Sequence, residues 1–434
     1  MGPAELSSIR HQLALKEKAL RDMTLSRDLQ TSLRREMEEL WQAAKYRTRA
    51  EIALKMKAQI KHEGELASLK EENRLKDETI CQLQHTLEST ITGDLFDCVD
   101  MYKQPAFDHP LLKNHTLQLK PSSFPKGMKL GKSKSASFYG FNDTCPSGTV
   151  LVHRARKQDL TKSQLLRNQF RAQAIIANEP TADQNHFAII ENAHGPFYGA
   201  YAKMATYKLP DLKANQTSSS TIYLLGNPHV PNNEINVIEA GWQVSTALYD
   251  SSYPRFFTFW TSDGHEKTGC PNLDCPGFIS TTNIYGPGSF IPEFSIYGGE
   301  QKYLSILIAR DSQTGNWWVT YNNQLPLGYF PKELLPKMQD HASVIQMGGH
   351  VNSPLSVPSP PMGSGHSSNE GWNKAAYFIQ VQLVTRSNNL IRLNPVFTFT
   401  TCDISDYYCV SDKHYTYDEN VYVFAYGGVG GFKK

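Results

Sequence analysis

The spacing of apolar residues divides the chain into two parts. Up to about residue 90, apolar residues recur at helical spacing among Lys, Arg, Glu and Gln, and no proline follows Pro3. This pattern predicts a coiled coil or a long helical hairpin over residues 1–92, with a lone solvated helix as the alternative. We call the line of apolar residues along these helices the seam. Its apolar positions are Leu6, Ile9, Leu13, Leu20, Met23, Leu66, Leu69, Ile80, Leu83 and Leu87.

A polar residue on the same seam indicates how the helices could associate. Asn73 falls on its second part, where an asparagine often fixes the register of a dimer. Self-association through the N-terminal helices is therefore expected. Lys16, Arg27 and Lys76 also fall on seam positions and weaken the pattern.

From about residue 185 the chain consists of short apolar runs separated by turn residues. Many short strands with few helices predict an antiparallel β-sandwich over residues 185–434. The Pro/Gly/Ser-rich stretch 352–369 is predicted to be a loop. The predicted strands are 187–191, 198–207, 221–225, 234–244, 303–309, 317–321, 344–351, 377–384 and 420–426.

Residues 94–180 form a third predicted unit between these two parts. The unit ends in a basic, helix-prone stretch, 154–171, which contains Lys157, Lys162 and Arg167. A small unit that ends in an exposed basic linker is typical of a removable pro-segment. An ordinary N-terminal subdomain is the alternative.

Composition excludes some classes of partner. The net charge of +2 indicates neither a nucleic acid nor an acidic membrane surface as a partner. No apolar run is long enough to span a bilayer. Charged residues such as Arg10, Lys16 and Arg21 interrupt any apolar stretch of a signal peptide at the N-terminus.

The cysteines indicate disulfides rather than a metal site. Cys81 lies in the helical part, and the close pairs farther along do not match Cys-x-x-Cys or accompany a histidine cluster. Disulfides imply an oxidising compartment, so secretion is expected for residues 94–434. The missing signal peptide conflicts with that expectation, and one hypothesis is that the helical segment was fused or mis-joined to a secreted module. The candidate disulfide cysteines are Cys98, Cys145, Cys270, Cys275, Cys402 and Cys409.

One carboxylate lies inside an otherwise apolar predicted strand. Glu239 shares one face of the strand with Val237, and the opposite face carries Ile238, Ala240 and Trp242. With both faces expected to be apolar, the carboxyl group should be dry and its pKa should be raised. A structural acid with satisfied hydrogen bonds is the alternative.

Several longer motifs carry a resemblance to a known family. They are Gln104-Pro105-Ala106-Phe107-Asp108-His109-Pro110, Glu239-Ala240-Gly241-Trp242, residues 269–278, residues 314–318, residues 328–331 and Met362-Gly363-Ser364-Gly365-His366. Together they resemble neprosin, a largely plant family of secreted glutamic peptidases. The resemblance implies an activation peptide over 94–180 and a β-sandwich peptidase domain over 185–434. It also implies cleavage after proline at acidic pH without a metal or cofactor, and it leaves out the helical segment.

The resemblance implies a catalytic pair of glutamates, the first of which is Glu239. The second is expected in a Gly-Gly-Glu-Val strand, but this chain has Gly348-Gly349-His350-Val351, so His350 stands at that position. A histidine that faces Glu239 would favour a carboxylate–imidazolium pair, which cannot share a proton as two carboxyls do. Loss of activity, altered chemistry and rescue by another acid such as Glu370 all stay open.

Aromatic residues on the predicted strands are the candidate substrate-binding residues. Such rings could line a cleft or stack on a proline ring, and packing in the core is the alternative. The candidates are Trp242, Trp317, Trp318 and Tyr329. The resemblance to neprosin therefore implies a glutamic-type endopeptidase that acts on proline-containing peptides at acidic pH. An inactive module that binds proline-rich or cell-wall proteins is the alternative.

Overall fold

The computed structural model divides the chain into two compact units, Met1–Leu83 and Gln84–Lys434. Most of the predicted basic stretch 154–171 lies outside the described residues. The described residues are 3–22, 27–82, 86–128, 134–154, 183–226, 234–246, 248–249, 251–411 and 421–433.

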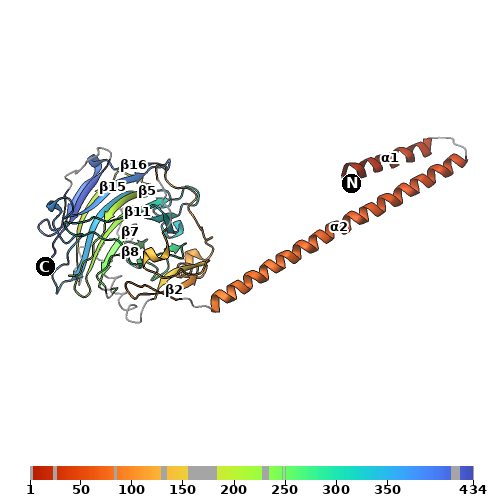
Figure 1. Cartoon of the computed structure of the whole chain (residues 1–434). Helices are drawn as coiled ribbons and strands as arrows, with labels where there is room; N and C mark the ends of the chain where they lie inside the picture. Colours follow the sequence, from red (N-terminus) through yellow and green to blue (C-terminus); the bar gives the residue numbers. More distant parts are fainter. Residues whose placement is uncertain are drawn as a thin grey trace. The chain divides into compact units, whose positions relative to one another are not determined.

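The first unit consists of two helices, α1 (Pro3–Asp22) and α2 (Arg27–Gln82) (Figure 1). An ion pair of 2.6 Å between Lys16 Nζ and Glu36 Oε2 joins them. The predicted helices are therefore confirmed, although Leu87 belongs to a strand. Leu66 and Leu69 are 46% and 56% exposed, so the coiled coil and the self-association stay predictions.

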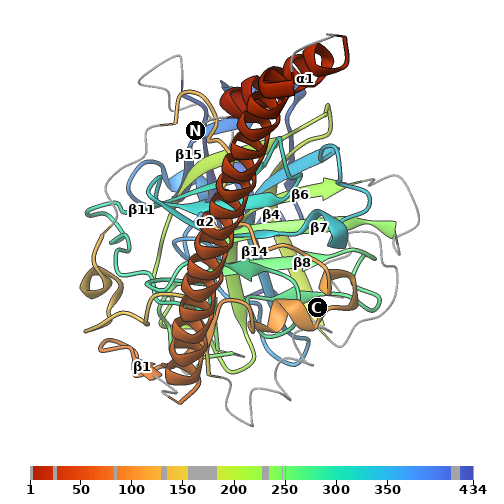
Figure 2. The ribbon, with the colours of Figure 1, turned by 90° about the vertical axis from the view of Figure 1, so that its right-hand side faces the viewer.

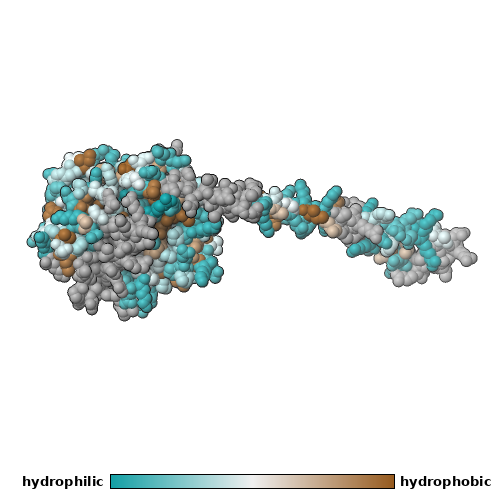
Figure 3. Space-filling model, turned by 90° about the horizontal axis from the view of Figure 1, so that it is seen from below, coloured by the Kyte–Doolittle hydropathy of each residue, from teal (hydrophilic) through white to brown (hydrophobic). Residues whose placement is uncertain are grey.

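The described surface of these helices is mostly hydrophilic, with a few isolated apolar patches (Figure 3). Exposed Trp41, Leu54 and Ile60 contribute to such apolar surface on α2. Their spacing does not follow one helical face, because at 100° per residue they are spread around the helix. Leu66 and Leu69 therefore do not form one continuous apolar stripe with these three residues.

The second unit contains a seven-stranded antiparallel sheet, whose strands β4, β14, β6, β7 and β8 lie side by side (Figure 2). Its order is β17 (Phe399–Cys402), β4 (Asp183–Asn192), β14 (Val344–Pro354), β6 (Thr217–Gly226), β7 (Asn236–Ser245), β8 (Arg255–Thr261) and β9 (Cys270–Pro271).

A nine-stranded antiparallel sheet forms the other layer. Its order is β10 (Ile279–Ser280), β13 (Leu325–Phe330), β12 (Trp317–Tyr321), β11 (Tyr303–Arg310), β5 (Gly199–Ala205), β15 (Ala376–Val384), β19 (Val423–Gly427) and β18 (Cys409–Ser411), and β16 (Leu390–Arg392) pairs with β15. A separate three-stranded sheet comprises β1 (Thr86–Glu88), β2 (Leu95–Asp100) and β3 (Thr149–His153).

Short 3₁₀ helices connect these strands. They are η1 (Pro105–Asp108), η2 (Pro110–Leu112), η3 (Ala136–Tyr139), η5 (Lys332–Leu334), η6 (Ser368–Glu370) and η7 (Pro395–Phe397).

The two large sheets pack face to face as a β-sandwich, which confirms the predicted fold class. The indole Nε1 of Trp242 on β7 donates to the carbonyl of Ala205 on β5 over 2.9 Å. Tyr426 Oη on β19 donates to Ser220 Oγ on β6 over 2.6 Å. All nine predicted strands of residues 185–434 belong to one of these sheets. Buried apolar side chains of both sheets form one core between them.

One glycine allows β6 and β7 to approach closely. A Cβ atom at Gly241 would lie 2.0 Å from Ser220 O and 2.7 Å from Thr221 Cα, both of which are backbone atoms. A side chain at this position would therefore force the two strands apart. The strands that carry the candidate carboxylate and its neighbours depend on this contact.

We expect Gly241→Ala to lower the free energy of unfolding of the full chain by more than about 2 kcal/mol, because backbone atoms cannot yield as side chains do. Near-UV circular dichroism in guanidinium measures this. Gly286→Ala is the control, since the nearest atom to its added Cβ is Leu151 O at 3.6 Å. Equal stability of the two variants would contradict the close contact.

Candidate functional site

One face of the seven-stranded sheet is polar although it is buried. Side chains opposite each other on neighbouring strands point to the same face, so Glu239 and Gln243 on β7 share it with Thr221 and Tyr223 on β6. We call these residues, together with His350 on β14, the polar face. The expectation that both faces around Glu239 are apolar therefore holds only in part: Phe257 and Phe259 on β8 share the Glu239 face and are buried, but so are the polar residues of β6 and β14. The opposite face packs in the core between the sheets.

Glu239 is an uncharged acid in this setting. The residue is 1% exposed, and its Oε2 accepts a hydrogen bond of 3.1 Å from Thr221 Oγ1. Its Oε1 has no hydrogen-bond partner among the described residues. Burial raises the pKa of Glu239 to about 8, and the hydroxyls of Thr221 and Tyr223 oppose this only in part. Glu239 therefore keeps its proton throughout the acidic range.

Tyr223 lies directly opposite Glu239 in the register of β6 and β7. It is 7% exposed, and its Oη has no hydrogen-bond partner of normal geometry in the described part of the chain. Burial, followed by the proximity of Glu239, raises the pKa of Tyr223 well above its usual value of 10. Its hydroxyl is therefore a neutral donor.

His350 is held by residues of β4. Its Nε2 lies 2.9 Å from Asn185 Oδ1, and its ring stacks on Phe187 with centroids 4.6 Å apart. Burial lowers the pKa of His350 to about 3, with smaller contributions from His186 and His265. The imidazole is therefore neutral except in strong acid.

The register separates His350 from Glu239. Glu239 lies opposite Tyr223, whereas His350 lies opposite Ser219, four residues along β6. This offset corresponds to about 13 Å along the strand, in addition to the width of β6 between them. The expected carboxylate–imidazolium pair is thus corrected: both groups are neutral between pH about 3 and about 8, because burial penalises both charges.

Two of the predicted substrate-binding residues belong to the core instead of the polar face. Trp242 and Trp317 are both fully buried between the sheets. Trp242 Nε1 donates to Ala205 O over 2.9 Å, and Trp317 Nε1 donates to Met338 O over 3.0 Å. Their indole groups are thus satisfied by backbone carbonyls.

The other two predicted substrate-binding residues hold the segment that precedes the sandwich. Trp318 Nε1 donates to Gln118 Oε1 over 3.1 Å. Tyr329 Oη accepts a hydrogen bond of 3.0 Å from Gln118 N and lies 2.8 Å from His115 Nε2. Both residues are buried, and neither lines the polar face with Glu239.

The same segment also contacts the seven-stranded sheet. Arg255, a buried residue of β8, forms an ion pair of 2.6 Å with Asp94. Burial would raise the pKa of Asp94, but the hydrogen bond with His153 and the charge of Arg255 outweigh it and lower the pKa. Residues 86–128 and 134–154 are thereby anchored on both large sheets.

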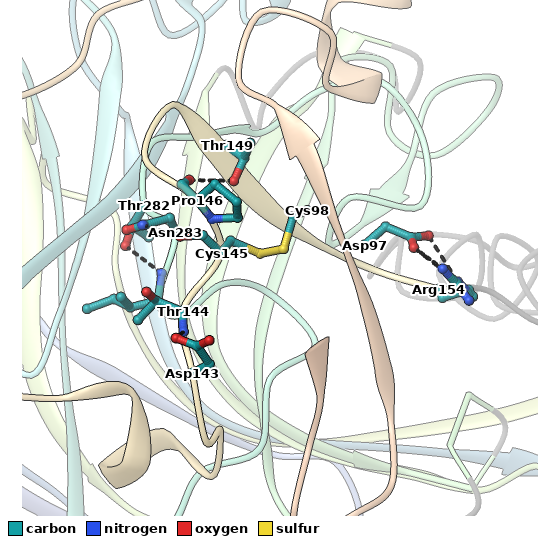
Figure 4. The surroundings of a disulfide bond; sticks show 11 residues. Asp97, Cys98, Asp143, Thr144, Cys145, Pro146, Thr149, Arg154, Thr282 and Asn283 are labelled. Carbon is teal, nitrogen blue, oxygen red and sulfur yellow. Dashed lines mark hydrogen bonds and ion pairs between the residues drawn. A yellow bond between two sulfur atoms is a disulfide. The ribbon is translucent and has the colours of Figure 1, made fainter. Parts of the chain in front are cut away.

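A disulfide between Cys98 and Cys145 closes this segment (Figure 4). Asn283 Nδ2 donates to Cys145 O over 2.7 Å and ties the disulfide to the sandwich. Cys402 and Cys409 form a second disulfide, and Cys275 is also disulfide-bonded. Five of the six predicted cysteines are therefore in disulfides, and the side chain of Cys270 lies outside the described residues.

Glu370 has a structural role. It forms a capping box with Ser367 at η6 and accepts a hydrogen bond of 2.7 Å from Tyr297 Oη. It is therefore a satisfied surface residue, in line with its expected loop position. Tyr223 and Thr221 were the residues that the sequence analysis missed, although the alternation within the predicted strand 221–225 places both on one face.

No group of three His, Cys, Asp or Glu side chains that could hold a metal ion occurs among the described residues. Within the same residues, no helix is both long enough and apolar enough to cross a membrane.

Family models match most of the second unit. Residues 87–194 match the Neprosin activation peptide, and residues 214–429 match Neprosin. These regions contain the anchored segment and the polar face described above. The chain is thus a β-sandwich protein with an activation-peptide region before the sandwich. It belongs to the Neprosin family.

Solved structures with a similar arrangement include two glutamic peptidases. Scytalido-glutamic peptidase with a peptide-based transition-state analogue is similar at 6% identity and a TM-score of 0.30, over 56% of this chain and 99% of its own. SCP-B, a member of the Eqolisin family in complex with the tripeptide Ala-Ile-His, is similar at 7% identity and a TM-score of 0.31, over 57% and 100%. A β-porphyranase of the human gut bacterium Bacteroides plebeius is similar over 37% of this chain and 53% of its own, at 9% identity and a TM-score of 0.20.

We expect Glu239→Gln to stabilise the protein relative to the natural chain as the pH rises. The unfolded chain loses the Glu239 proton near the ordinary pKa of 4.5 and the folded chain only near 8, so ionisation favours unfolding between these values. The difference in free energy of unfolding between the two proteins should grow by a few kcal/mol, on the order of 3, from pH about 4 to 8. Urea denaturation at both pH values measures it, and a difference independent of pH would refute the raised pKa.

Proposed function

We propose that the chain is a glutamic-type endopeptidase that acts on proline-containing peptides at acidic pH, with Glu239 as its main catalytic group. The observation that carries this proposal is the buried, uncharged carboxyl of Glu239, whose Oε1 has no partner among the described residues. At acidic pH this group is a carboxylic acid, because burial raises the pKa of Glu239 to about 8. A carboxylic acid can polarise a scissile carbonyl or protonate a leaving nitrogen.

Hydrolysis also needs an acceptor for a proton of the attacking water. His350 stands at the position of the second glutamate, and its imidazole is neutral above pH about 3, since burial lowers the pKa of His350. Its Nε2 contacts Asn185. The residue of β6 opposite His350 is four positions from the residue of β6 opposite Glu239. At that separation from Glu239, His350 can take the proton only through intervening water molecules, so we expect slow hydrolysis.

The polar face suits an extended peptide. Asn352 lies on β14 two residues from His350, so its side chain is on the same face of the sheet. Gln243 Oε1 and Asn352 Oδ1 are buried acceptors without partners in the described part of the chain. Such groups can accept hydrogen bonds from peptide N–H groups along the strands. A proline-rich peptide is stiff and loses little entropy when it binds, which favours this class of substrate.

Binding without hydrolysis is the second candidate function. The stacking of His350 on Phe187 and its contact with Asn185 favour it, because they hold this residue away from a catalytic role. In that case the protein binds proline-rich or cell-wall proteins. The disulfide-bonded cysteines favour an oxidising, extracellular location for the second unit.

We expect His350→Glu to raise hydrolysis of a proline-containing peptide by about tenfold or more between pH about 3 and 7, because it supplies a second carboxyl on the polar face. Glu239→Gln should lower hydrolysis by the natural chain about 100-fold. Mass spectrometry of the peptide after incubation with the full chain measures both rates.

Glu370→Gln is the matched control, since this carboxyl caps a surface turn and its loss should leave hydrolysis unchanged. Peptide binding without hydrolysis by the natural chain, and hydrolysis by the His350→Glu variant, would establish the second candidate function. A rate of hydrolysis that Glu239→Gln leaves unchanged would contradict the main proposal.

A further inference from the structure

Two buried oxygen atoms without hydrogen-bond partners occur on adjacent strands of the polar face. They are Tyr223 Oη and Glu239 Oε1, and neither has a partner of normal geometry among the described residues. Buried polar atoms in folded proteins are generally hydrogen-bonded, so each such exception calls for a reason. A ligand atom that completes both hydrogen bonds is one such reason.

The register fixes how these groups lie. Tyr223 is paired directly with Glu239 across β6 and β7, so both side chains point to the same face. Directly opposite residues have Cβ atoms about 5 Å apart. The interaction between them is also evident in the pKa of Tyr223, which burial and then Glu239 raise. The two groups can therefore reach one ligand atom together.

The hydrogen bond from Thr221 favours the second oxygen of Glu239 as the one that carries the proton. Thr221 Oγ1 donates to Glu239 Oε2 over 3.1 Å, so Oε2 is the acceptor oxygen of the carboxylic acid. The proton then belongs on Oε1, the oxygen without a partner. Glu239 thus presents a hydroxyl donor beside the hydroxyl donor of Tyr223.

We infer that Tyr223 and Glu239 form a two-donor site that binds the oxygen of a peptide carbonyl and holds the oxyanion that develops there. This inference rests on the proposed function and adds Tyr223 to it as a catalytic residue. Preorganised donors in a site with little water stabilise developing negative charge better than water does. A tyrosine hydroxyl next to a neutral carboxylic acid is a known form of such a site.

The chemical step balances with these groups. The oxygen of water forms a bond to the carbonyl carbon, and the π electron pair moves to the carbonyl oxygen, which Tyr223 and Glu239 then hydrogen-bond. The pair returns as the C–N bond breaks. Glu239 gives its proton to the leaving nitrogen and takes one from the added water, so it ends protonated as it began. The products are a carboxylic acid and an amine, and Tyr223 keeps its own proton throughout.

The direct test is infrared spectroscopy of a proline-containing peptide labelled with ¹³C at the proline carbonyl. Two donors polarise the carbonyl, so its band should shift to lower frequency when the peptide binds the full chain. Tyr223→Phe should lose part of this shift and lower the rate of hydrolysis about 100-fold, with a change in peptide affinity below about tenfold. The shift is a readout of binding that does not depend on hydrolysis.

Tyr303→Phe is the matched control. Tyr303 also has a buried hydroxyl without a partner in the described residues, but it lies on β11 in the other sheet, so its removal should change neither the shift nor the rate. Thermal unfolding of both variants shows that they are folded.

The outcomes distinguish failure of the two-donor site from failure of the peptidase proposal. An equal shift in Tyr223→Phe and in the natural chain overturns the two-donor site, as does hydrolysis that this variant leaves unchanged. A shift that depends on Tyr223, without any hydrolysis, supports the site and contradicts the peptidase proposal. Absence of peptide binding by the natural chain overturns both.

Discussion

Burial of the Glu239 carboxyl without a compensating positive charge is the constraint on which the rest of the site depends. Transfer of an ionised carboxylate away from water costs so much that the group retains its proton instead. The hydroxyl groups of Thr221 and Tyr223 oppose the effect of burial on this carboxyl, and hydroxyl donors cannot offset that cost. Glu239 is therefore a neutral carboxylic acid, and the neighbouring side chains contact an uncharged group.

The two faces of the seven-stranded sheet differ in what they contact. One face packs against the nine-stranded sheet, where Trp242 and other large side chains fill the core. This leaves the second face available for polar side chains at adjacent register positions. Residues 86–128 and 134–154 anchor to the sandwich through Asp94 and Arg255 and through Gln118, which Trp318 contacts. Trp318 and Tyr329 thus hold Gln118 against the sandwich and do not line the polar face.

Much of the fold could be predicted from the sequence, because apolar residues recur at helical spacing up to about residue 90 and in short runs separated by turn residues from about residue 185. Strand β8 was missed because its run of aromatic residues lacks alternation, and β13 because Pro326 and Gly328 interrupt it. Glu239 was recognisable as a carboxyl in an apolar strand. Its cross-strand neighbour was not, because register is set by pairing and cannot be read from one strand. For the same reason the offset of His350 could not be predicted.

The protonation state of Glu239 is the most direct test of this account. Infrared difference spectra of the natural chain against Glu239→Gln, recorded from pH about 4 to 10, follow the C=O band of the protonated carboxyl. The account predicts that this band persists through neutral pH and disappears with a midpoint near 8. A midpoint below pH about 5, close to that of an exposed glutamate, would contradict it.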